Sequence, residues 1–223
     1  MIGPLPSGEQ PFVPRIYPYN YGKYDFRAAI SRIFGVSGSG LDGLGFEGEY
    51  ETFKRGTDQS SGYHRKFYAS WEREVEPLYR SFIAEAIAPV VPEPFIYQKV
   101  PTFRVHLPGN VAVGEFHTDA EYNHPEGEVN FWLPVTSAFR SNSIAIQMPG
   151  IRGVDFMPVE YGEVLVFDAV RYYHGNVRNL TGRTRVSIDF RILLKRLYKP
   201  TGLRTVNTGS LLEIGDYYAE YQP

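Results

Sequence analysis

The chain has 223 residues, of which 43% are hydrophobic and 22% charged, a composition typical of a globular protein with one sizeable core. Its 23 basic and 25 acidic residues nearly balance, so no electrostatic case exists for nucleic-acid binding. Without cysteine the chain offers no disulfide framework and no thiolate ligand, which leaves histidine and carboxylates for metal binding. No segment reaches membrane-spanning length and no secretion signal is evident, so we expect a cytoplasmic protein without membrane contacts.

The sequence predicts one domain over residues 1–223. A proline-rich arm and buttressing helices (1–94) precede a β-rich core (95–194), whose short aromatic-rich segments alternate with turns. A carboxy-terminal extension (195–223) follows. Within it the apolar segment 211–218 is expected to pack either on the core or on a partner, so the oligomeric state stays open.

Helices are expected only in the amino-terminal part. The first is predicted over Phe26–Phe34 and is ended by Gly35. A glycine-rich loop (37–48) follows, which we expect to be mobile. From Arg65 to Ala88 apolar residues recur at steps of three and four, which predicts one amphipathic helix packed on the core.

The most informative motif is a His-x-Asp pair. If His117 and Asp119 lie on a strand, their side chains point to the same face and can grip one ion. A third ligand must come from elsewhere, and His174, placed between two predicted strands, is the best candidate. Two imidazoles and one carboxylate on one face of an ion leave the opposite positions open, which suits non-haem Fe(II). The alternative is a structural network in which histidine and aspartate satisfy each other.

An anion clamp is predicted on the strand that follows. Ser187 shares a strand face with Arg185, so a hydroxyl and a planar guanidinium could together receive a carboxylate. The alternative is that Arg185 is a surface charge beside Arg183. Its apolar neighbour Val186 makes the strand a wall of the core, so the opposite face is expected to line the interior.

The order His-x-Asp, distant His and Arg-x-Ser, over roughly Phe95–Leu194, resembles the Fe(II)/2-oxoglutarate-dependent oxygenases. More narrowly, residues 116–122, 130–136 and 181–190 resemble the StrG-type oxygenases of streptomycin biosynthesis, which are relatives of the phytanoyl-CoA hydroxylases. The same type includes the orthoester-forming oxygenase of hygromycin B biosynthesis, a specificity that this chain could share.

The resemblance implies a mainly β fold, a double-stranded β-helix (jelly roll, cupin-like) with flanking amino-terminal α-helices. It also implies that His117, Asp119 and His174 hold Fe(II), and that Arg185, helped by Ser187, binds the distal carboxylate of 2-oxoglutarate. With O2 as second cosubstrate, 2-oxoglutarate would be converted to succinate and CO2 while the substrate loses a hydrogen atom.

Further residues are candidates for the same pocket. Beside the cosubstrate we place Trp132, Asn130 and Arg104, with a core tryptophan and a rim ion pair as the alternatives for the first and last. The candidates for substrate contacts are His106, Glu121, Tyr122 and His124. The alternatives are a hydrogen-bonded interior histidine for His106 and simple solvent exposure for His124.

The expected substrate is a small molecule, an aminoglycoside or an aminocyclitol-sugar precursor. The loop carboxylates Glu121, Glu126 and Asp155 could pair with its ammonium groups. Hydroxylation, desaturation and ring closure all begin with the same hydrogen abstraction, so the sequence leaves the outcome open. Two other classes remain: a cupin-type sugar isomerase or epimerase that needs no 2-oxoglutarate, and a non-catalytic carbohydrate-binding jelly roll.

Overall fold

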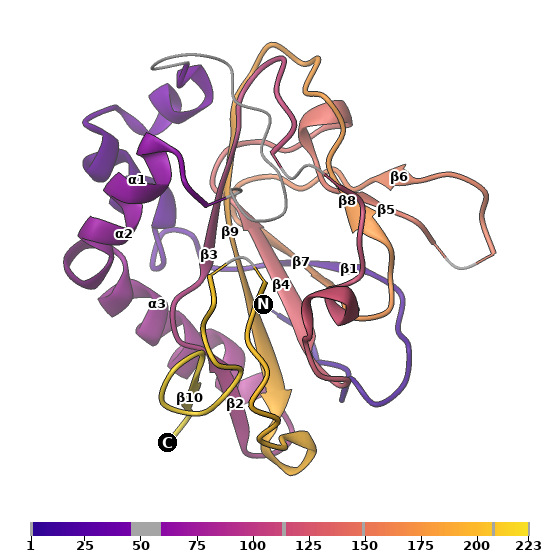
Figure 1. Ribbon diagram of the computed structural model, residues 1–223. Helices are drawn as coiled ribbons and strands as arrows, with labels where there is room; N and C mark the ends of the chain where they lie inside the picture. The colour runs from indigo at the N-terminus through magenta and orange to yellow at the C-terminus, as the bar shows by residue number, and fades with distance from the viewer. Residues whose placement is uncertain (1, 46–58, 113–114, 149, 207, 223) are drawn as a thin grey trace.

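The computed structural model describes residues 2–45, 59–112, 115–148, 150–206 and 208–222. It contains two antiparallel sheets and a layer of helices (Figure 1). The strands of the large sheet are β1 (Arg15–Pro18), β2 (Phe95–Gln98), β3 (Thr102–His106), β4 (Val129–Pro134), β7 (Glu163–Phe167), β9 (Arg185–Leu194) and β10 (Tyr218–Glu220). Their order is β1-β7-β4-β9-β2-β10, and β3 also pairs with β9. The small sheet has the order β6-β5-β8, with β5 (Ala145–Ile146), β6 (Asp155–Phe156) and β8 (His174–Gly175).

The first helix agrees with the sequence prediction. Helix α1 spans Phe26–Phe34; the Asp25 side chain caps its start, and Gly35 ends it at a positive φ of 67°. The loop that follows differs from the prediction, because Gly38–Gly43 form a 3₁₀ helix, η1. Residues 46–48 of the glycine-rich loop lie outside the described residues.

The second predicted helix is not continuous. It divides into α2 (Gly62–Glu74) and α3 (Glu76–Phe82), and a π-helical turn, η2 (Ile83–Ile87), completes it. The break falls at Val75, whose φ is −121°, and Pro77 lies in the first turn of α3. Proline has no N–H to continue the helical hydrogen bonds, so the prediction of one helix was wrong at this point. Shorter 3₁₀ turns are η3 (Ala88–Val90), η4 (Asp119–Tyr122), η5 (Arg140–Asn142) and η6 (Lys195–Leu197).

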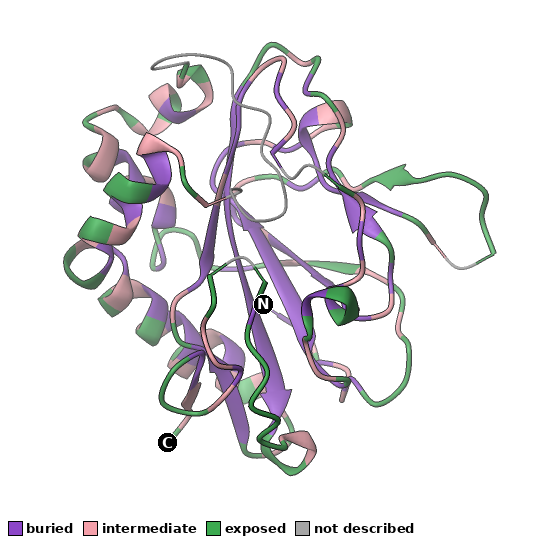
Figure 2. Ribbon diagram, viewed as in Figure 1, coloured by how far each residue is buried: buried purple, intermediate pink, exposed green. Residues whose placement is uncertain are grey.

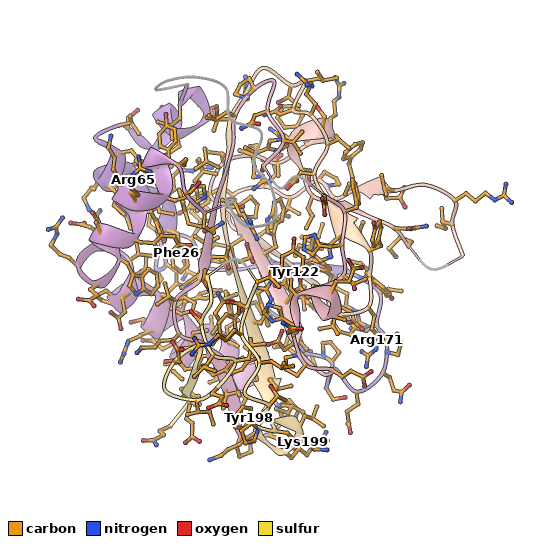
Figure 3. The ribbon with its side chains drawn as sticks, viewed as in Figure 1. Phe26, Arg65, Tyr122, Arg171, Tyr198 and Lys199 are labelled. Carbon is orange, nitrogen blue, oxygen red and sulfur yellow. The ribbon has the colours of Figure 1, made fainter. Side chains whose placement is uncertain are left out.

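The helices cover one face of the large sheet, and strands β3, β4 and β9 are buried (Figures 1 and 2). Aromatic rings make this contact. Phe67 of α2 stacks on Phe103 of β3 with 4.2 Å between ring centroids, and Tyr79 of α3 meets Phe190 of β9 edge-on. Phe26 lies in the helical layer (Figure 3). None of the helices in the described part of the chain is long and apolar enough to cross a membrane.

Strand β9 is buried along its whole length and has two chemically different faces. Successive side chains point to opposite faces of a strand. The apolar residues are Val186, Ile188, Phe190 and Ile192, which belong to the core under the helices. The polar residues are Arg185, Ser187, Asp189 and Arg191, which therefore point away from the helices. A buried row of charges is stable only when it is paired or meets a ligand.

The carboxy-terminal extension folds back on the large sheet. Its last strand, β10, pairs with β2, and Leu212, Tyr217 and Tyr218 pack against Ile96 and Leu193. Of the two expectations for the apolar segment 211–218, packing on the core is the one that the structure shows.

Candidate metal centre

Three side chains that are far apart in the sequence meet on the sheet face opposite the helices. Asp119 Oδ1 lies 3.7 Å from His117 Nε2 and 3.6 Å from His174 Nε2, and one ligating atom from each residue fits within a 4.8 Å span. All three residues are buried. The structure therefore brings together the three residues that the sequence singles out.

The local backbone differs from the expected strand. His117 forms an isolated β-bridge with His174, with two N–H···O bonds of 2.9 Å, and Asp119 starts the turn η4. The two segments approach so closely that a Cβ added to Gly175 would lie 2.9 Å from Phe116 Cγ. Glycine at position 175 thus permits the contact that brings the two histidines together.

Hydrogen bonds fix the orientation of both imidazoles. His117 Nδ1 lies 3.1 Å from the Glu115 carbonyl and His174 Nδ1 lies 2.9 Å from the Tyr172 carbonyl. Because a carbonyl only accepts, each Nδ1 carries the proton and each Nε2 presents a lone pair toward Asp119. Burial lowers the pKa of His117 to about 4 and also lowers that of His174. Two neutral imidazoles and a carboxylate are a donor set that fits a divalent iron ion.

The second oxygen of Asp119 is occupied. Arg191 donates to Asp119 Oδ2 from Nε at 2.8 Å and approaches it with Nη2 at 2.7 Å. Burial, the largest single influence, would raise the pKa of the Asp119 carboxyl, but Arg191 together with the neighbouring histidines outweighs it and holds that pKa well below its usual range. Asp119 is therefore ionised, with Oδ1 directed at the two histidines.

Arg185 and Ser187 also come together, as predicted. Arg185 Nη1 donates to Ser187 Oγ at 2.8 Å and its Nε donates to the Asn142 carbonyl at 3.0 Å, while its guanidinium lies 5.3 Å from the ring centroid of Trp132. Burial, and then Arg104, lower the pKa of Arg185 to about 9, so the group is still charged at neutral pH. Its alternative as a surface charge is wrong, because the side chain is fully buried.

The other cosubstrate candidates lie beside this clamp. Arg104 Nε is 3.5 Å from Asp189 Oδ1, an ion pair in the interior rather than on the rim of the sheet. Asn130 is buried, and its Oδ1 has no hydrogen-bond partner among the described residues. A buried acceptor without a partner costs free energy, so a bound molecule with a donor would be stabilised there.

Two cavities meet at the cluster. The inner cavity is narrow, about 40 Å³, and its wall includes Arg185, Trp132, Asn130 and His174. The outer cavity is about 390 Å³, and residues of the segments 98–102 and 208–217 supply much of its wall. Residues that line both are Arg104, His117 and Arg191. The geometry thus provides a charged inner site and a larger outer site on either side of the same ligand cluster.

The four substrate candidates are placed differently. Tyr122 lies on the cluster, with its ring 4.4 Å from that of His117, on the sheet face away from the helices (Figure 3). His124 lines the outer cavity; the alternative of simple exposure is wrong, because its side chain is 7% exposed and its Nδ1 lies 2.8 Å from Glu128 Oε2. His106 lines neither cavity. It is a buried residue, with Nε2 2.9 Å from the Asn110 carbonyl.

The loop carboxylates also lie away from the cavities. Glu121 is exposed and accepts from the backbone of Thr118 at the start of η4. Glu126 and Asp155 are exposed, and neither lines the inner or the outer cavity. Asp155 lies on β6 of the small sheet.

Sequence reasoning missed Arg191, Asp189 and Glu128, which surround Asp119 and Arg104. The first two had a signal in the sequence. The alternation that puts Arg185 and Ser187 on one face continues through Asp189 to Arg191. Glu128 had no such signal, because it is a loop residue brought to Arg191 by tertiary packing.

No family model matches the chain. The streptomycin biosynthesis protein StrG of Streptomyces griseus is 39% identical over 178 residues, which cover 80% of this chain and 84% of StrG. Among solved structures, the nickel complex of the non-heme monooxygenase ThoJ is similar with a TM-score of 0.53 at 15% identity, over 94% of this chain and 86% of ThoJ. The apo form of ThoJ gives a TM-score of 0.53 at 14% identity, over 97% of this chain and 86% of ThoJ.

The likeness to ThoJ shows the fold and confirms the predicted jelly roll. The identity with StrG over most of both chains shows the family. The donor set and the buried arginine are compatible with the Fe(II) and 2-oxoglutarate that the sequence resemblance implies. The chain therefore belongs to the StrG family.

Proposed function

We propose that the protein is a non-haem Fe(II)- and 2-oxoglutarate-dependent oxygenase that oxidises an aminoglycoside, or an aminocyclitol-sugar precursor of one, in the formation of an antibiotic. In this proposal His117, Asp119 and His174 hold Fe(II), and Arg185 with Ser187 receives the distal carboxylate of 2-oxoglutarate. The observation that carries these roles is the buried guanidinium of Arg185, for which the described residues provide no carboxylate partner. A buried, unpaired cation is costly unless an anionic ligand completes it.

The bound iron, with 2-oxoglutarate and O2, supplies the oxidation that removes one hydrogen atom from the substrate. The chain's own residues bind and orient. Asp119 and the two histidines would hold the ion, and a set of only three protein ligands would leave it free to bind the cosubstrates. Trp132 packs beside the Arg185 guanidinium, and Asn130 presents its amide to the same inner cavity. Arg104 stands where the inner and outer cavities meet and could contact the 2-oxoglutarate or the substrate.

The outer cavity is the proposed substrate site. Its volume of about 390 Å³ lies in the range typical of sites for small organic molecules. Hydroxyl and amide groups on its wall suit a polyhydroxylated ligand and come from Tyr68, Gln98, Thr102, Thr205, Thr208 and Ser210. The name of StrG as a streptomycin biosynthesis protein supports the aminoglycoside class. Tyr122 and His124 are the proposed contacts nearest the iron.

An ammonium group of the substrate has a different partner from those the sequence suggested. Among carboxylates on the outer cavity wall, Asp119 is committed to the ligand cluster, whereas Asp216 is exposed to solvent. Asp216 Oδ2 accepts from the Leu211 N–H, which fixes the carboxylate near the cavity. We therefore assign the ammonium contact to Asp216 rather than to Glu121, Glu126 or Asp155.

The test is turnover of 2-oxoglutarate with a panel of aminoglycosides and their biosynthetic precursors, with succinate and the organic product both measured. Gain of one oxygen atom in the product indicates hydroxylation. Loss of two hydrogen atoms indicates desaturation or a ring closure such as orthoester formation. All three outcomes need one 2-oxoglutarate and one O2 for each product.

Two results would contradict the proposal. An isomerised sugar formed without consumption of 2-oxoglutarate would identify a cupin-type isomerase, in which the Arg185 clamp has no role. Metal-free sugar binding with no turnover would identify a carbohydrate-binding protein. An Arg185→Ala variant is assayed beside the natural chain. If the natural chain consumes 2-oxoglutarate slowly and the variant consumes none, the cosubstrate site is present and the substrate is merely a poor one; equal consumption by both would indicate that the cosubstrate site is absent.

A further inference from the structure

Arg191 holds Asp119 by one oxygen and leaves the other for the histidines. Its Nε donates to Asp119 Oδ2 at 2.8 Å and its Nη2 lies 2.7 Å from the same atom, whereas Oδ1 is the oxygen closest to both Nε2 atoms. A rigid guanidinium that approaches one carboxylate oxygen with two of its nitrogens holds that oxygen in place more firmly than a single donor can.

Arg191 is itself held from three sides. Its Nη1 donates to Gln98 Oε1 at 3.1 Å and to Asp189 Oδ2 at 3.2 Å, and its Nε lies 3.9 Å from Glu128 Oε2. Glu128 also accepts from the hydroxyl of Tyr218, on the carboxy-terminal strand β10. The guanidinium is therefore fixed by strands β2, β9 and β10 and by the loop before β4, and it has little freedom to turn away from Asp119.

A second group of ligating atoms surrounds Asp119. One atom each from Asp119, His124 and Glu128 also lies within a 4.8 Å span, which would suit a second metal ion. The Arg191 guanidinium already faces both carboxylates of this group, so a fixed positive charge stands where a second cation would bind. Asp119 then has one free oxygen for one ion.

We propose that Arg191 is a positioning residue that makes Asp119 a one-oxygen ligand and keeps the centre mononuclear. This inference rests on the proposed metal site. A positioning effect and a simple charge effect predict opposite changes in metal affinity. A positive charge beside a metal ion repels it, so a charge effect predicts tighter metal binding when the charge is removed. A positioning effect predicts weaker binding, including in a variant that keeps the charge.

The experiment measures the dissociation constant of Co(II) for the metal-free protein, by competition with a chromophoric chelator and without 2-oxoglutarate. Arg191→Lys keeps the charge and loses the fork; Arg191→Met loses both. We expect one Co(II) per natural chain and, in both variants, a dissociation constant raised by about 10-fold or more, as is usual for residues that orient a ligand. Arg171→Lys is the matched control, because Arg171 pairs with buried Asp168 at 2.8 Å outside the cluster, and its dissociation constant should stay within about twofold of the natural one.

The outcomes are distinguishable. If the natural chain binds no Co(II), the metal site is wrong and the inference falls with it. If it binds one ion and Arg191→Lys binds as tightly, the metal site stands and the positioning role is wrong. Tighter binding by Arg191→Met would also overturn it, in favour of a charge effect. Thermal unfolding of each metal-free variant shows whether it is folded. If Arg191→Lys is not folded, the comparison rests on Arg191→Met.

Discussion

Arg185 Nη1 donates to Ser187 Oγ at 2.8 Å, and both residues are buried in the interior of the protein. Arg185 lines the narrow cavity beside His174, and Ser187 holds its guanidinium from behind. In a medium of low dielectric constant this arrangement is stable with an anion in place and costly without one. The relationship between these two residues is the main structural argument for a carboxylate cosubstrate.

Removal of the guanidinium should weaken 2-oxoglutarate binding. Charge-assisted hydrogen bonds contribute about 1.5–3 kcal/mol each, so Arg185→Ala should raise the dissociation constant of 2-oxoglutarate by about 10- to 100-fold. Isothermal titration of the metal-loaded protein measures it. Arg183→Ala is the control, since Arg183 precedes the same strand but its side chain is 64% exposed, and it should bind as the natural chain does. Equal weakening in both variants would contradict the clamp.

Loss of a ligand should abolish stabilisation by metal. An ion present at 100 times its dissociation constant raises the free energy of unfolding by about 2.7 kcal/mol. We expect urea unfolding with and without Co(II) to show this increase in the natural chain and not in His174→Ala. His106→Gln should keep it, because His106 lies outside both cavities. A Co(II) effect that survives in His174→Ala would place the metal elsewhere.

His106 should make the metal-free protein sensitive to mild acid. Burial, and then Arg185, lower its pKa from the ordinary 6.5 to about 3. Between these values the unfolded chain binds a proton at His106 and the folded chain does not. The free energy of unfolding therefore falls as the pH drops below 6.5, by up to about 1.4 kcal/mol per pH unit from this residue, and is unaffected by it above 6.5.

The comparison for His106 is His106→Gln, which keeps a side-chain donor near the Asn110 carbonyl. Urea unfolding at several values between pH 7.5 and 4.5 should give a shallower loss of stability for the variant, by about one proton per molecule. The buried histidines of the metal cluster titrate in both proteins and cancel in the difference. Parallel curves would show that His106 is protonated in the folded protein.

A methyl group at position 175 should disturb the metal centre. The Cβ of an alanine would lie 2.9 Å from Phe116 Cγ and 3.1 Å from Phe116 Cα, so the bridge between His117 and His174 must open. We expect Gly175→Ala to lose about 1–3 kcal/mol of stability, as other overpacked sites do, and to bind Co(II) more weakly. Gly43→Ala is the control, because a Cβ there meets nothing within 4 Å. Unchanged metal affinity in Gly175→Ala would show that the bridge does not position the ligands.

Part of this site was predictable because it depends on patterns between residues that are close together in the sequence. The two-residue period of a strand places Arg185 and Ser187 on one face, and the same period would have given Asp189 and Arg191. The capping residues Asp25 and Gly35 likewise mark the ends of α1. The three metal ligands, His117, Asp119 and His174, were identified from their residue types and their order in the chain, because no local pattern shows that they come together.

Other features depend on tertiary packing. Asp119 reaches the cluster from the turn η4 rather than from a strand, and the bridge at His117 needs the chain at Gly175 beside it. Glu128 meets Arg191 only because the loop before β4 lies against β9. Such contacts have no period in the sequence. The break at Val75 did have a local signal, since Pro77 follows two residues later.

The most direct test of the account is anaerobic titration of the Fe(II)-loaded protein with 2-oxoglutarate, followed by its weak visible charge-transfer absorption. Chelation of the iron by the keto acid should produce a band that saturates at one 2-oxoglutarate per chain. The band should be lost in His117→Ala and should need far more 2-oxoglutarate in Arg185→Ala. Iron that binds stoichiometrically and gives no band with 2-oxoglutarate would contradict the cosubstrate site.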